Sequence, residues 1–172
     1  MQPGRSESAM MTSAEQARFR IDRPNARPRA TCVIALDERS AAALAAISNR
    51  SWNAARFLRY VGARKASAHL PSLNIDAVLR DAGGNEVSLA KEVSGADAIV
   101  MVAATPGVSE AAEIIGNACA PCGIAVTGML LDPAAGEGVL GRMLSAMRPH
   151  TSMLVVSSSE DYVAEMLAAL RA

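Results

Sequence analysis

Aromatic residues are scarce in this chain, where they make up 3% of the 172 residues. The core of a folded domain must therefore be built mainly from aliphatic side chains and methionine. Apolar residues still make up 51% of the chain and charged residues 20%, a balance that is typical of folded proteins and excludes a disordered chain. The length is close to the ~150 residues of an average domain, so we expect a single folded domain.

An excess of charge of one sign is also lacking. The 17 basic residues balance the 17 acidic ones, which gives no indication of a surface for polyanions or charged membranes. The longest apolar runs, 98–104 and 124–131, are far shorter than the ~20 residues of a membrane-spanning helix. The first residues contain no apolar stretch of the kind that secretory signals have. We therefore expect a cytoplasmic protein with neither a nucleic-acid nor a membrane partner.

Cysteine is rare, and three residues cannot supply a disulfide framework for a domain of this size, so we expect a reducing compartment. Cys119 and Cys122 form a C-x-x-C, but they follow a predicted helix, whereas a reactive thiolate is favoured at a helix N-terminus. Zinc would need two further ligands, and Cys32, His69 and His150 are too scattered to supply them. We interpret the cysteines as structural thiols and expect no metal site.

Residues 1–29 differ in composition from the rest of the chain. They contain three prolines, several serines and five arginines between Arg18 and Arg29. Glu15 precedes these arginines, Asp22 lies between them, and only Phe19 could stack on a base, so a solvated tail is favoured over a nucleic-acid-binding arm. We expect a disordered tail over 1–29 and one α/β domain over 30–172.

Beyond the tail, short apolar runs alternate with amphipathic stretches. We expect strands over 31–36, 98–104, 124–131 and 153–157, and helices over 109–119, 139–147 and 160–170. Strands that are apolar throughout and separated by helices are typical of a parallel sheet covered on both faces. The pattern predicts a three-layer α/β/α sandwich with a mostly parallel sheet of about four or five strands, Rossmann-like or flavodoxin-like.

A long helix is predicted over 40–60, because Leu44, Ile47 and Leu58 recur at helical spacing and Gly62 would end it. Trp52, Phe57 and Tyr60 do not all fit the apolar stripe of this helix. Aromatic side chains off the core stripe suggest an interface, so we expect a homodimer built on this helix or on the closing helix 160–170.

The middle of the chain is less regular. The runs 75–79 and 86–89 predict a hairpin, because the Gly83-Gly84-Asn85 sequence between them suits a turn with positive φ. A short helix over 88–93 is the alternative to the second strand.

Ligands of open parallel sheets bind beyond the carboxyl ends of the strands, where helix N-termini present free N–H groups. Four predicted loops at this edge contain small, hydroxyl or glycine residues that let a ligand approach the backbone. The candidate ligand-binding residues are Asp37, Arg39, Thr105, Gly107, Ser109, Asp132, Gly136, Gly138 and Ser158. Helix capping is the alternative role for each loop, since Asp, Ser and Thr are also the usual N-cap residues.

The sequence 136–141 (GEGVLG) matches the dinucleotide pattern G-x-G-x-x-G, and Glu160 follows at a suitable distance. However, residues 132–135 separate the predicted strand from the first glycine, and the loop of the first strand–helix unit contains no glycine. The P-loop pattern is absent from the sequence. The cofactor therefore stays unassigned.

Two functions from different classes remain. The first is a small-ligand-binding domain that holds an anionic metabolite, such as a nucleotide, an acyl-CoA or a phosphorylated compound, at the carboxyl edge of the sheet. The second is a non-catalytic interaction subunit that packs as a homodimer or within a larger complex. The two lysines and two histidines of the chain offer few catalytic groups, so both functions are favoured over catalysis.

Overall fold

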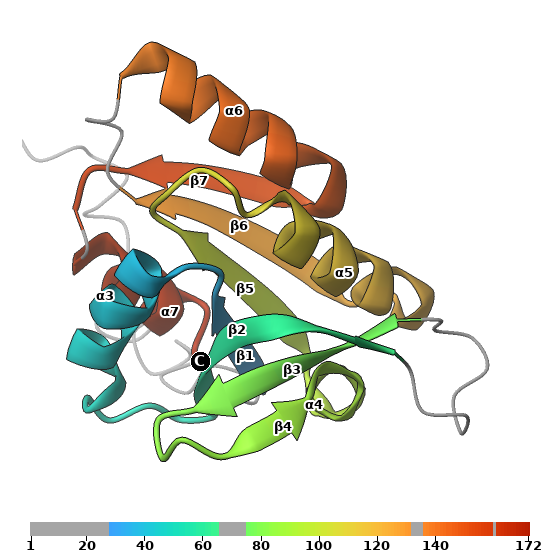
Figure 1. Ribbon diagram of the computed structural model, residues 1–172. Coiled ribbons are helices and arrows are strands. Elements are labelled where there is room, and N and C mark those ends of the chain that lie inside the picture. Colours follow the sequence, from blue (N-terminus) through green and yellow to red (C-terminus); the bar gives the residue numbers. More distant parts are fainter. Residues whose placement is uncertain (1–27, 66–74, 132–135, 160) are drawn as a thin grey trace, which may run out of the picture.

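Seven strands form one twisted sheet in the computed structural model, which describes residues 28–65, 75–131, 136–159 and 161–172 (Figure 1). The strands are β1 (Thr31–Ala35), β2 (Ala55–Lys65), β3 (Ile75–Asp81), β4 (Glu86–Ser88), β5 (Ala98–Ala103), β6 (Ala125–Leu131) and β7 (Met153–Ser157). The helices are α3 (Glu38–Ser48), α4 (Leu89–Gly95), α5 (Ser109–Cys119), α6 (Glu137–Met147) and α7 (Asp161–Ala169), with short 3₁₀ turns η1 (Ala120–Cys122) and η3 (Arg148–His150).

The strand order is β4-β3-β2-β1-β5-β6-β7. Strands β2, β1, β5, β6 and β7 are parallel, and β3 and β4 continue the sheet as an antiparallel meander beside β2. The chain moves from β1 toward β2 on one side and later enters β5 on the other side of β1. The direction of winding therefore reverses between β1 and β5, which makes this the topological switch point of the sheet.

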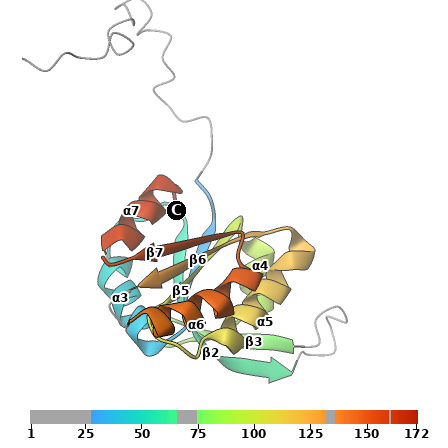
Figure 2. The ribbon, with the colours of Figure 1, turned by 90° about the horizontal axis from the view of Figure 1, so that it is seen from above.

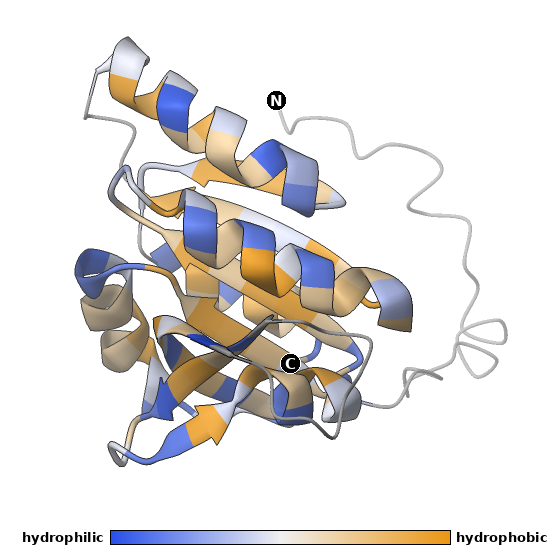
Figure 3. Cartoon of the chain, turned by 45° about the vertical axis from the view of Figure 1, so that its right-hand side comes forward, coloured by the Kyte–Doolittle hydropathy of each residue, from blue (hydrophilic) through white to orange (hydrophobic). Residues whose placement is uncertain are grey.

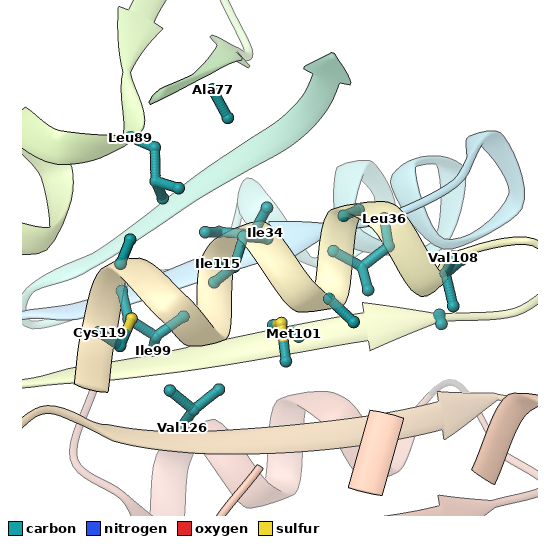
Figure 4. Packing of buried hydrophobic residues seen from close by; sticks show 14 of the residues in the cluster. Ile34, Leu36, Ala77, Leu89, Ile99, Met101, Val108, Ile115, Cys119 and Val126 are labelled. Atoms are coloured by element: carbon teal, nitrogen blue, oxygen red, sulfur yellow. The ribbon is translucent and has the colours of Figure 1, made fainter. Parts of the chain in front are cut away.

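Helices cover both faces of the sheet, as the view along its β7 edge shows (Figure 2). One core lies between the sheet and α4, α5 and α6, and Ile115 of α5 lies there among Ile34, Ile99 and Met101 (Figure 4). The other core lies between the sheet and helices α3 and α7. Because β1 and β5 are buried on both faces, their runs of apolar residues have no polar alternation. The three-layer α/β/α sandwich expected from the sequence is thus confirmed.

Most of the expected elements are present within a residue or two of their predicted ends. The hairpin is present as β3 and β4, and its turn contains Gly84 at a φ of +84°. The alternative helix is present too, because α4 begins directly after the three residues of β4. With the two hairpin strands and β2 in the sheet, the strand number exceeds the expected four or five.

The predicted long helix over 40–60 is wrong. Helix α3 ends at Ser48, and Ala55–Lys65 form strand β2 between β1 and β3. The helical spacing of Leu44 and Ile47 ends at the mostly polar residues 48–53. The aromatic residues Phe57 and Tyr60 that follow favour a strand. Strand β2 is covered on both faces near Leu58 and therefore carries apolar residues on both faces. The spacing of these residues along the sequence resembles that of a helix.

The aromatic side chains that suggested a dimer on this helix have partners within the chain. The rings of Trp52 and Phe57 lie 5.6 Å apart, and both pack against the core beneath α3. Trp52 Nε1 also donates a hydrogen bond of 3.0 Å to the Ile47 carbonyl. These contacts remove the reason for placing a dimer interface on residues 40–60.

Candidate functional site

The loops that follow β1 and β5 meet at the switch point, where a carboxylate joins them. Asp37, the N-cap of α3, accepts a hydrogen bond from the Ser40 N–H through Oδ1, and Ser40 completes a capping box. The Oδ2 atom of Asp37 accepts hydrogen bonds from the N–H groups of Ala104 (2.8 Å) and Thr105 (3.2 Å). Asp37 therefore caps α3 and fixes the β5–α5 loop at the same time, and its carboxylate lies between the two loops.

The N-terminus of α5 is arranged differently. The loop turns at Gly107, whose φ is +100°, and the N-cap Val108 offers no side-chain acceptor. The hydroxyl of Ser109 makes no hydrogen bond within the described part of the chain. Glu110, the acid of the first turn, is held on the β2 side of the helix, where Tyr60 OH donates to its Oε1 at 3.1 Å. Burial, followed by this contact with Glu110, raises the pKa of Tyr60 to about 12.

Helix α6 begins without a side-chain cap as well. Its N-cap is Gly136, at a φ of +82°. Helices α5 and α6 lie side by side over the sheet and turn hydrophilic residues outward (Figure 3). Both N-termini lie at the carboxyl edge of the parallel strands, so the positive ends of two helix dipoles occupy the same edge.

An open groove of about 640 Å³ runs between these two helices. Its lining residues are Ser109, Gly138, Gly141, Arg142, Ser145 and Ala146. The exposed Arg142 makes no ion pair or hydrogen bond within the described residues, whereas Arg56, Arg59, Arg64 and Arg80 each have an acidic partner within 4 Å. The groove thus combines an unpaired cation, a free hydroxyl and small residues that leave room for a ligand.

The structure brings some of the sequence-predicted site residues together. Ser109 and Gly138 line the α5–α6 groove, while Asp37 and Thr105 share the hydrogen bond at the switch point. Arg39 is exposed in the first turn of α3, and Ser158 is exposed in the loop after β7. Asp132 lies outside the described residues. Sequence reasoning missed Arg142, although its position off the apolar stripe of a predicted helix placed it on an exposed face.

The G-x-G-x-x-G pattern spans the start of α6. Gly136 precedes the helix, and both Gly138 and Gly141 are on its exposed side in the groove. A Cβ atom at either of the latter two positions would meet nothing within 4 Å. These two glycines therefore open the groove, and no contact within the described chain requires them.

Cys32 and Cys119 have the environment of buried structural thiols, whereas Cys122 is exposed. Cys119 is buried at the end of α5, and its burial, with a smaller effect of Cys122, raises its pKa to about 12. Burial also raises the pKa of Cys32 to about 12, with Glu92 adding to the effect. No cluster of three or more His, Cys, Asp or Glu side chains that could hold a metal occurs among the described residues.

Comparison with models of known families and with curated proteins gives no match for this chain. In the part of the chain that the structure describes, no helix has the length and apolar character needed to cross a membrane.

Proposed function

We propose that this protein is a binding domain for a small anionic molecule, whose charged group occupies the groove between α5 and α6. The observation that carries the proposal is that Arg142, which has no acidic partner among the described residues, lines the same groove as Ser109 at the uncapped N-terminus of α5. A phosphate or carboxylate there would accept from the guanidinium, the Ser109 hydroxyl and the free N–H groups of the first helical turn. The capped N-terminus of α3 offers no comparable place, since Asp37 already supplies the negative charge.

The lining of the groove favours binding over catalysis. None of its six described lining residues is a histidine, cysteine, lysine or carboxylic acid, so these six residues supply no general acid or base for work near neutral pH. The volume lies in the range of small-molecule sites, ~300–1,000 Å³. An anionic metabolite of the nucleotide, acyl-CoA or sugar-phosphate class would place its phosphate at Arg142 and extend along the open groove.

A thermal-shift screen with nucleotides, acyl-CoA esters and sugar phosphates tests this function. A ligand at 100 times its dissociation constant stabilises the fold by ~2.7 kcal/mol, which corresponds to a rise in Tm of about 5–10 °C for a chain of this size. Arg142→Gln is expected to abolish the shift, because it removes the charge and keeps much of the side chain.

Arg148→Gln is the matched control, since Arg148 is an exposed arginine that follows the same helix but does not line the groove. This variant is expected to retain the full shift. If no member of the panel raises Tm, or if Arg142→Gln binds as the unaltered protein does, the proposal is wrong.

A further inference from the structure

The two edges of the sheet differ in how they are protected. At one edge, β4 has only three residues, includes Glu86 in an ion pair with Arg80, and passes directly into α4. Short, charged edge strands resist pairing with another chain. At the other edge, β7 (MLVVS) has five residues without a charge, a proline or a glycine, and among the described strands it pairs with β6 alone.

Exposed apolar side chains gather at this second edge. Among the described residues, four large hydrophobic side chains are exposed, and three of them lie on β7 or in the first turn of the helix that follows it. They are Met153 at 48%, Val156 at 41% and Tyr162 at 41% relative exposure. Leu154 and Val155 are half-buried, in contact with the cores on opposite faces of the sheet.

The backbone of β7 is also incompletely paired. In a strand, every second residue directs its N–H and C=O groups away from the neighbouring strand. No described residue makes a hydrogen bond to the N–H and C=O groups of β7 that point away from β6. Helices α6 and α7 lie on opposite sides of the sheet beside this edge (Figure 2).

We propose that β7 pairs with the β7 strand of a second copy of this chain, in antiparallel orientation, so that two sheets join into one continuous sheet. A two-fold axis normal to the sheet brings the same strand of both copies together and satisfies the outward N–H and C=O groups of each. A partner for this edge must be uncharged where it meets β7 and must match its apolar side chains on both faces. The strand fulfils these conditions for itself, because every antiparallel self-pairing places only Met, Leu, Val and Ser opposite one another.

Sedimentation velocity of the full chain tests the proposal. At micromolar concentration the unaltered protein is expected to sediment as a dimer, with twice the 17.9 kDa mass of the chain. Val156→Lys places a charge in the pairing edge and is expected to weaken dimerisation at least ~100-fold, leaving a monomer under the same conditions. Met153→Lys is expected to do the same and serves as the second variant if Val156→Lys does not fold, with folding followed by the thermal melt.

Val61→Lys is the matched control, because Val61 is an equally exposed valine at 45% but lies on β2. This variant is expected to remain a dimer. A monomeric unaltered protein, a dimer that survives both β7 variants, or dissociation by Val61→Lys would each overturn the proposal. A monomer that dimerises only after deletion of residues 1–27 would assign the edge to that segment and would also overturn it. The outcome is independent of Arg142 and hence of the anion-binding proposal.

Discussion

A single carboxylate connects β2, β3 and α4 at the residue level. Asp76 on β3 accepts a hydrogen bond from the N–H of the next residue, Ala77. The same oxygen of Asp76 accepts a second one from the N–H of Ala90 in the first turn of α4. Its other oxygen accepts from the Ser88 hydroxyl at 2.8 Å and from Arg64 at 3.2 Å. The N-cap Ser88 makes no capping bond of its own, so Asp76 caps α4 from a neighbouring strand.

The pKa of Asp76 is lowered in the folded protein. Burial alone would raise it, but the hydrogen bonds from Ser88, Ala77, Ala90 and Arg64 together outweigh that effect. The ionised carboxylate therefore stabilises the fold above the unfolded-state pKa near 3.8, and this stabilisation is lost as the pH falls through the lower pKa of the folded state.

The first prediction is that Asp76→Asn lowers the free energy of unfolding by about 1–3 kcal/mol at pH 7, because it removes a charged acceptor of several hydrogen bonds. The difference between the two proteins should begin to shrink as the pH falls below about 4, where the unfolded chain binds a proton at Asp76, and it should shrink further as the pH falls through the lower pKa of the folded state. Urea unfolding at several pH values measures both effects. Glu165→Gln, at an exposed residue of α7, should change the stability by no more than ~0.5 kcal/mol, and a pH-independent loss for Asp76→Asn would contradict the argument.

Local residue roles could be predicted from the sequence where the partner is close along the chain. Helix capping was the alternative role given for Asp37, and its bond to Ser40 lies within three residues. Its second role, holding Ala104 and Thr105, could not be predicted because it depends on β1 and β5 being neighbours. Arg142 was missed for the same reason, since its significance comes from the position of α5 and not from its own sequence neighbours.

At the scale of elements, the packing of α6 against β6 and β7 depends on one glycine. A Cβ atom on Gly128 of β6 would lie 2.6 Å from Leu154 Cδ1 and 2.8 Å from the Thr151 methyl group. The Cε atom of Met147, at the end of α6, would be 3.1 Å away. The side chains around Gly128 therefore occupy the space that any larger residue needs.

The second prediction is that Gly128→Ala lowers the free energy of unfolding by about 1–3 kcal/mol, as overpacked core substitutions do. Gly141→Ala provides a control of opposite sign. Gly141 lies on the open side of α6, and a new Cβ there would meet nothing within 4 Å. The substitution should therefore raise the free energy of unfolding by about 0.5–1 kcal/mol through helix propensity. Chemical denaturation of the two variants distinguishes these outcomes, and an unchanged stability of Gly128→Ala would show that the side chains of Leu154, Thr151 and Met147 can move aside.

The accuracy of the element prediction depended on periodicity. Strands β1, β5, β6 and β7 were expected because their apolar runs are short and bounded by turn residues. Strand β2 was not expected, because Leu58 faces one core while Phe57 faces the other. A strand with apolar residues on both faces and arginines between them lacks the two-residue alternation by which a half-buried strand is recognised.

At the scale of the whole molecule, the chain segment before β1 is hydrogen-bonded to the C-terminal end of the chain and to the loop before β5. The Arg29 N–H donates to the carbonyl of Arg171, at 3.4 Å, near the end of the chain. Ala30 exchanges hydrogen bonds with Asp97 before β5: its N–H donates to Oδ2 at 3.0 Å, and its carbonyl accepts from the Asp97 N–H at 2.7 Å. Arg29 and Ala30, on either side of the boundary expected at residue 30, therefore both bond to the rest of the domain.

The third prediction concerns where the chain can be shortened. The composition of residues 1–27, with arginine, serine and proline and few large apolar side chains, gives them little apolar area to bury. A chain of residues 28–172 is therefore expected to melt within about 1 °C of the full chain. A chain of residues 31–172 loses the bonds of Arg29 and Ala30 and leaves Asp97 without its partner, at a cost of about 1–3 kcal/mol, so its Tm should fall by roughly 2–12 °C. Melting curves of the three lengths at one protein concentration measure both steps. A large drop already at 28–172 would mean that the first 27 residues pack on the domain, and equal Tm values for all three would show that the bonds to Asp97 and Arg171 contribute nothing to the fold.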